Sequence, residues 1–226
     1  MASPDALPLK TLNAEHSTLN LPMIYLASQS PRRRQLLEQL GVPARLLLPA
    51  DAEAAEALEA ERAGEAPSAY VRRVTRLKLQ AAAQRWREQR LPPAPLLCAD
   101  TTVALGRQIL GKPADAADAR RILSLLAGRR HRVLTAVAVA RPASRGQGRQ
   151  WAALSTSQVA FDAWSAADIR RYVDGGEPMG KAGAYAIQGG AALHIRHISG
   201  SYSGIMGLPA HETAQLLRAS GVRLAC

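Results

Sequence analysis

The chain has 226 residues, which is typical of one domain or two small ones and is ample for a hydrophobic core. Hydrophobic residues make up 47% of the sequence and charged residues 21%, as in soluble globular proteins, and no apolar run reaches the roughly 18 residues of a membrane span. The formal net charge of +11 predicts attraction to polyanions, which include nucleic acid, an anionic membrane surface and a small phosphorylated substrate.

The start of the chain carries charges and prolines without an uninterrupted apolar segment. We therefore expect residues 1–20 to be a flexible tail and not a signal peptide, and residues 21–226 to form a single domain. The two cysteines, Cys98 and Cys226, have neither a metal-binding spacing nor the pattern of a disulfide framework, which indicates a reducing compartment. The expected location is the cytoplasm.

A strand that runs directly into a helix is expected at residues 24–40. Ser30 is a favourable N-cap, and Pro31 suits the first helical position because its missing N–H would have had no partner there. Three arginines follow at positions 32–34, although the positive end of the helix dipole disfavours cations. A bound anion would reverse that penalty, so these residues indicate either a phosphate-binding site or a solvated basic turn.

The rest of the chain alternates between strand and helix patterns, which predicts an α/β fold. Strands are expected at residues 45–48, 96–99, 133–139, 154–161 and 193–198, with a ribbon at 103–110 that turns at Gly106. Helices are expected at residues 68–90, 115–127, 165–174 and 209–219. Residues 51–65 are expected to be a frayed helix or a loop, and residues 141–150 a surface loop. Residues 200–204 are expected to be a flexible turn, whose hydroxyls could also face a ligand.

Asp100 follows the apolar strand expected at residues 96–99, where open α/β sheets usually bind ligands beyond the carboxyl ends of their strands. A carboxylate at this place could hold a divalent metal or orient a water, and it could equally cap Thr101 locally. Lys78 lies at the margin of an apolar helix face, and Lys112 lies in a constrained Gly-Lys-Pro turn. Cations that neutralise phosphate oxygens, beside acids that carry a metal, are the parts that phosphoryl chemistry needs.

Signatures of other protein classes are missing from the sequence. It has neither the Gly-x-x-x-x-Gly-Lys-Ser/Thr loop of P-loop proteins nor the Gly-x-Gly-x-x-Gly fingerprint of Rossmann folds. A non-enzymatic protein that binds nucleic acid is the main alternative, because the excess of basic residues would suit it. Aromatic residues make up only 4% of the chain and form no stacking platform, which disfavours that alternative.

Six ordered blocks of the sequence resemble the Maf family. They are, in chain order, Leu26-Ala27-Ser28-Gln29-Ser30-Pro31-Arg32-Arg33, Ala99-Asp100-Thr101, Gly111-Lys112-Pro113, Gly128 with His131-Arg132-Val133-Leu134-Thr135-Ala136-Val137, Lys181-Ala182-Gly183-Ala184-Tyr185-Ala186-Ile187-Gln188-Gly189, and Gly207-Leu208-Pro209. The resemblance extends over residues 21–221. It implies an α/β fold with a central mixed sheet flanked by helices, and two lobes around a deep nucleotide-binding cleft, similar to the inosine triphosphate pyrophosphatases.

The resemblance also implies an activity. Nucleoside triphosphate pyrophosphatases of this family hydrolyse the bond between the α- and β-phosphates, and they use a divalent cation such as Mg²⁺ or Mn²⁺. The fifth block is similar to the subgroup that acts on dTTP and UTP, and not to the one that acts on 7-methyl-GTP. Modified pyrimidine or purine triphosphates remain alternative substrates, and the family has also been associated with blocking septum formation. The implied role is housecleaning of the nucleotide pool, and the sequence leaves a homodimer open.

The candidate site residues come from matching the family's motifs to this chain. Asp100 matches the catalytic aspartate, which acts as a general base or as a metal ligand. The phosphate-binding residues match Ser28, Arg32, Arg33, Lys78 and Lys112, and the positions linked to base selection match Arg32, Thr101 and Gln188. The amide of Gln188 can both donate and accept a hydrogen bond, as the edge of uracil or thymine requires.

The second metal-binding acid has a less direct match. Counting without gaps from Ser30 leads to Glu53, whose neighbour Ala52 stands where the family often has another acid. We therefore expect Glu53 to bind the metal together with Asp100, with an added water in place of the missing acid. Judged from its own surroundings in the sequence, Glu53 is a solvated glutamate.

Overall fold

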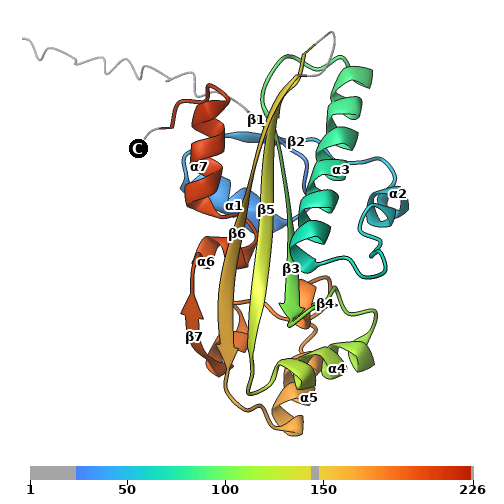
Figure 1. The fold of residues 1–226 in the computed structure, drawn as a ribbon, viewed down its shortest axis with the longest axis vertical. Coiled ribbons are helices and arrows are strands. Elements are labelled where there is room, and N and C mark those ends of the chain that lie inside the picture. The colour runs from blue at the N-terminus through green and yellow to red at the C-terminus, as the bar shows by residue number, and fades with distance from the viewer. Residues whose placement is uncertain (1–23, 144–147, 225–226) are drawn as a thin grey trace, which may run out of the picture.

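The computed structural model describes residues 24–143 and 148–224. Seven strands form one central sheet in the order β2-β1-β3-β5-β6-β7, with β4 paired to β3 (Figure 1). They are β1 (Ile24–Leu26), β2 (Ala44–Leu46), β3 (Leu96–Leu105), β4 (Gln108–Leu110), β5 (Arg130–Arg141), β6 (Arg149–Phe161) and β7 (Ile195–Ser199). β1 is parallel to β2 and β3, whereas the other pairs are antiparallel, so the sheet is mixed as expected.

Helices flank the sheet, and local capping signals set where several of them begin. They are α1 (Pro31–Gln39), α2 (Ala52–Ala57), α3 (Pro67–Glu88), α4 (Ala116–Leu126), α5 (Ala166–Asp174), α6 (Tyr202–Met206) and α7 (Ala210–Ala219). Pro31 opens α1 after Ser30, while the side chains of Asp115 and Ser165 cap α4 and α5 by accepting a backbone N–H three residues on. Within the described ranges, no helix is long and apolar enough to cross a membrane.

The long strands connect two lobes. β3, β5 and β6 run from a lobe that holds α1, α3 and α7 to a second lobe that holds α4 and α5 (Figure 1). On one face of the sheet, α3 buries Val71, Val74 and Leu79 over β3 and β5. Small side chains of β5, such as Ala136 and Ala138, pack in the same clusters and let the helix lie close to the sheet.

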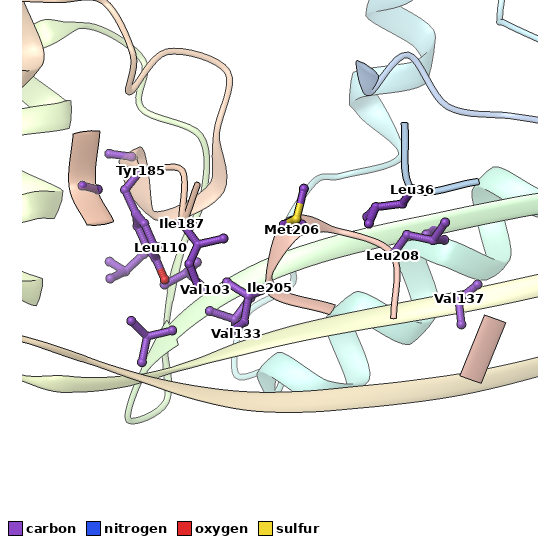
Figure 2. Close-up of a cluster of buried hydrophobic side chains, with 14 of the residues drawn as sticks. Leu36, Val103, Leu110, Val133, Val137, Tyr185, Ile187, Ile205, Met206 and Leu208 are labelled. Atoms are coloured by element: carbon purple, nitrogen blue, oxygen red, sulfur yellow. The ribbon is translucent and has the colours of Figure 1, made fainter. Parts of the chain in front are cut away.

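The largest hydrophobic cluster spans both lobes (Figure 2). It contains Leu36 of α1, Val103 of β3, and Tyr185 and Ile187 from the glycine-rich segment at residues 180–190. Gly183 in this segment has a φ of +72° and packs so closely on Val103 that a Cβ would lie 2.7 Å from its side chain, which only glycine avoids. The core therefore anchors the glycine-rich segment beside β3.

Two expectations about local structure are wrong. β3 does not end before Asp100 but continues for five residues beyond it, because its pairing with β5 places Asp100 opposite Ala136 and runs on past it. Residues 200–204 are not a flexible turn but lead into α6, since the Ser201 hydroxyl accepts the Gly204 N–H as an N-cap. The expected tail at residues 1–20 lies outside the described residues, as do residues 144–147 of the expected surface loop.

Candidate active site

A cleft of about 1040 Å³ opens between the two lobes. Eight of the nine candidate residues line it, namely Ser28, Arg32, Arg33, Lys78, Asp100, Thr101, Lys112 and Gln188. Glu53 does not: it is exposed near the start of α2, where its N–H donates to Asp51 Oδ1 at 2.9 Å. The geometry therefore gives no support to Glu53 as a metal ligand. Glu59 reaches the cleft in its place.

Arg33 is held in the cleft by three hydrogen bonds. Its Nη1 donates to Ser28 Oγ at 2.9 Å, its Nε donates to the Gly207 carbonyl at 2.8 Å, and its Nη2 donates to Thr101 Oγ1 at 3.3 Å. Burial lowers the pKa of the guanidinium, and the nearby carboxylate of Asp100 opposes that shift. The guanidinium is thus a fixed positive charge in a partly dry site, where it interacts strongly with an anion.

The hydroxyl of Thr101 belongs to a chain of hydrogen bonds with a fixed direction. Thr135 Oγ1 must donate to the carbonyl of Gly204 at 2.7 Å, because a carbonyl can only accept. Thr101 Oγ1 therefore donates to Thr135 Oγ1 at 2.9 Å, and it accepts from Arg33. In this arrangement Thr101 orients Arg33 and has no proton left for a nucleobase, so base selection at Thr101 stays a prediction.

Arg32 and Lys181 place two further cations in the cleft. Arg32 is half-buried, its Nε donates to the Met206 carbonyl at 3.3 Å, and burial lowers its pKa. Burial and the charge of Arg32 lower the pKa of Lys181, whose ammonium donates to the carbonyl of Glu177. Two cations that repel one another are stabilised by an anion bound between them, so this part of the cleft suits a phosphate.

A chain of alternating charges joins both lobes of the cleft. Lys78 Nζ lies 2.6 Å from Asp100 Oδ1 and 2.6 Å from Glu59 Oε1, and Lys112 Nζ lies 3.0 Å from Glu59 Oε2. Burial raises the pKa of Asp100, and attraction to Lys78 and Arg33 offsets only part of that shift. Burial alone would lower the pKa of Lys78, but the two carboxylates outweigh it and the pKa is raised. Asp100 is therefore a buried carboxylate of increased basicity.

Glu59 is the acid that sequence reasoning missed. It belongs to the Ala/Glu-rich segment at residues 51–65, whose glutamates have no pattern that separates one from another. Its carboxylate is buried enough that desolvation would raise the pKa, but Lys78 and Lys112 lower it overall. The only signal in the sequence is the presence of Lys78 and Lys112 on other elements. These lysines contact Glu59 only in the folded chain.

The Asp100 and Glu59 carboxylates fit a divalent cation that is held jointly with a substrate. Both approach a common point, which the Lys78 ammonium occupies, and Mg²⁺ commonly uses one or two carboxylates together with substrate phosphates and waters. Within residues 24–143 and 148–224, no group of three or more His, Cys, Asp and Glu side chains forms a metal-binding cluster. The pair alone is the candidate ligand set.

Gln188 lies at the tip of a tight turn in the wall of the cleft. The Gly189 N–H donates to the Ala186 carbonyl at 3.1 Å and closes the turn. Ile187 points into the core, whereas the side chain of Gln188 is exposed and lines the cleft. An accessible amide can donate and accept at once, which is what a nucleobase edge requires.

Fold and site together define an α/β protein with a cleft for a phosphorylated ligand. The chain belongs to the Maf family, because the family model for Maf-like proteins matches residues 23–220. The family that the motifs indicated is thus confirmed.

Relatives with high identity cover most of the chain. A dTTP/UTP pyrophosphatase from Polaromonas sp. (strain JS666 / ATCC BAA-500) is 64% identical over 201 residues, which cover 89% of this chain and 97% of the relative. A dTTP/UTP pyrophosphatase from Albidiferax ferrireducens is 60% identical over 201 residues, with 89% and 98% covered. Among solved structures, a HAM1 protein from Coxiella burnetii matches with a TM-score of 0.44 at 14% identity, covering 88% of this chain and 100% of that one.

Proposed function

We propose that the protein is a nucleoside triphosphate pyrophosphatase that hydrolyses dTTP and UTP to the monophosphate and pyrophosphate. The observation that carries the proposal is the convergence of Arg33 and Lys78 on the buried carboxylate of Asp100, with Lys112 joined through Glu59 and the amide of Gln188 in the same cleft. Relatives of 60% and 64% identity that are named dTTP/UTP pyrophosphatase support it.

In this proposal the cations bind the triphosphate. Arg33 is preorganised by its three hydrogen bonds, so little is lost when it binds a phosphate oxygen. Arg32 and Lys181 gain a counter-charge, and the first N–H groups of α1 add to the positive field. These groups act more strongly as negative charge moves onto the leaving pyrophosphate.

Asp100 prepares the attacking water. Its raised pKa suits a general base, which takes a proton from the water as the oxygen attacks the α-phosphorus. The bond from the α-phosphorus to the bridging oxygen breaks, and pyrophosphate leaves with the electron pair. Lys78 holds the Asp100 carboxylate in place through a 2.6 Å contact when no metal is bound. A divalent cation, Mg²⁺ or Mn²⁺, would take the place of that ammonium between Asp100 and Glu59 and would neutralise phosphate charge when bound.

The base is read by Gln188, whose amide matches the carbonyl and imide N–H of uracil or thymine. The biological role that follows is housecleaning, in which nucleoside triphosphates are removed in the cytoplasm before polymerases use them. Modified uridine triphosphates present the same edge and are candidate substrates as well.

The test is pyrophosphate release from dTTP, UTP, CTP, modified uridine triphosphates and 7-methyl-GTP. Each is assayed with Mg²⁺, with Mn²⁺ and after chelation, using the wild type and Asp100→Asn. We expect turnover of dTTP and UTP that the substitution and the chelator both abolish. Intact substrates under every condition would overturn the proposed activity, whereas turnover that resists chelation would overturn only the metal requirement.

A further inference from the structure

We propose that Glu177 and Tyr172 are positioning residues that hold Gln188 in place for the nucleobase. The inference rests on the proposed function, because it concerns base recognition in the same cleft. Neither side chain lines the cleft itself, so any effect on a ligand has to pass through the turn that carries Gln188.

The two side chains form a clamp behind that turn. Glu177 Oε1 accepts the hydroxyl proton of Tyr172 at 2.8 Å, and Glu177 Oε2 accepts the N–H of Gly190 at 2.9 Å. The Tyr172 oxygen in turn accepts the N–H of Ala186 at 3.3 Å. Both carboxylate oxygens and both functions of the hydroxyl are thus used within the clamp.

The clamp forms one hydrogen bond with the backbone on each side of Gln188. Ala186 lies two residues before Gln188 and Gly190 lies two residues after it, so one anchor secures each side of the turn. A Cβ at Gly189 would lie 2.0 Å from Glu177 Oε1, so a side chain at this position would displace the carboxylate. The carboxylate therefore lies directly against the backbone of the turn.

The clamp also has a rigid support and a link to the phosphate-binding cations. The Tyr172 ring packs edge to face on Trp164, with ring centroids 5.4 Å apart and an interplanar angle of 82°. The backbone carbonyl of Glu177 accepts from the Lys181 ammonium. Base recognition and one of the cleft cations thus depend on the same residue, which is why a loosened clamp should weaken nucleotide binding more than the chemical step.

The experiment compares Glu177→Ala, Glu177→Gln and Tyr172→Phe with the wild type. Asp174→Asn is the matched control, because it removes an exposed carboxylate at the end of α5, near the clamp in sequence. For Glu177→Ala we expect KM for UTP to rise about tenfold with kcat changed less than about twofold, and the preference for UTP over CTP to fall. Glu177→Gln keeps one carbonyl acceptor and should recover part of the loss, while Asp174→Asn should match the wild type.

An unchanged KM and an unchanged UTP-to-CTP preference in folded Glu177→Ala would overturn the inference. If that variant does not fold, Tyr172→Phe decides, because it keeps the ring and removes only the hydroxyl. Binding of an α,β-non-hydrolysable UTP analogue, measured by calorimetry, separates the two proposals. A wild type that binds the analogue but releases no pyrophosphate overturns the proposed reaction, and the analogue affinities of the variants then decide the positioning role.

Discussion

The two ends of the cleft are built differently. At the phosphate end, which comprises Ser28, Arg33 and Asp100, the functional groups stand on or beside the central sheet, and Asp100 lies inside a strand paired with β5. At the base end, which comprises the turn from Ala186 to Gly189, Gln188 stands on a short loop held from behind by side chains. In the proposed function, chemistry thus relies on the sheet, whereas base recognition relies on the clamp of Glu177 and Tyr172.

The difference has a physical reason in the sheet itself. β1 pairs with β3 only as far as Leu97, and the Ala27 N–H adds a last bond to the Leu97 carbonyl. Between Leu97 and Val103, where the pairing with β4 begins, this edge of β3 is open, and Asp100 faces the cleft where the chain after β1 turns into α1. The residues of the phosphate end are therefore held rigidly by strand pairing. The loop of the base end can vary without disturbing the phosphate end.

The largest effect is expected for Asp100→Asn. The substitution removes the proposed general base, so kcat for dTTP and UTP should fall by about 10³-fold. Affinity for the non-hydrolysable UTP analogue should persist, since a negative charge close to the phosphates has been removed. Steady-state kinetics and calorimetry measure the two quantities, with Asp174→Asn as control. A variant that retains a tenth of the wild-type kcat would contradict the assigned role.

Arg33→Lys should have the next largest effect. Lysine keeps the charge but cannot make three hydrogen bonds in the fixed directions of a guanidinium, so kcat/KM should fall by about 10²-fold. Arg34→Lys, on the exposed face of the same helix, should change little. Equal effects of the two substitutions would show that net charge, and not the placement of Arg33, matters at the phosphate end.

Gln188→Ala tests the base end directly. Loss of the amide should reduce the preference for UTP over CTP by about tenfold and leave kcat nearly unchanged, because the phosphate end is untouched. Competition assays with both nucleotides measure the preference, with the exposed Gln215→Ala as control. An unaltered preference would contradict base recognition by Gln188, and with it the positioning role of Glu177.

The smallest effect on turnover near neutral pH is expected from the titration of His131. Its main effect is a loss of folding stability at acid pH. Burial lowers the pKa of His131, whose Nε2 pairs with the Tyr185 hydroxyl at 2.8 Å, to about 4. The unfolded chain takes up this proton at about pH 6.5, so stability is lost as the pH falls from about 6.5 towards about 4, by an amount on the order of 2 to 3 kcal/mol.

Chemical denaturation across this pH range measures the slope. His131→Gln, which keeps an acceptor for Tyr185, should flatten it, and the exposed His211→Gln should not. Because Tyr185 precedes the turn of Gln188, the UTP-to-CTP preference should weaken in the acid range before the affinity for inorganic pyrophosphate does. The opposite order would indicate that the phosphate end is the less stable of the two.

The sequence by itself determined the family, the mixed α/β fold and most element positions. Signals such as Ser30-Pro31 or the Asp115 cap depend on neighbouring residues, so they can be read without knowing the fold. Each motif block is also local in sequence, so its residues can be matched to the family without knowing the fold. Eight of the nine candidate residues found in this way line one cleft.

Only the tertiary structure decided which acids meet which cations. Nothing local distinguishes Glu59 from Glu53, because the choice depends on contacts with Lys78 and Lys112 from other elements. The continuation of β3 through Asp100 depends in the same way on pairing with β5, which follows much later in the chain. The contact of the Glu177 carboxylate with the backbone at Gly189 and Gly190 is a further contact of this kind. Such contacts are set by packing over long sequence separations, which residue patterns along the chain do not record.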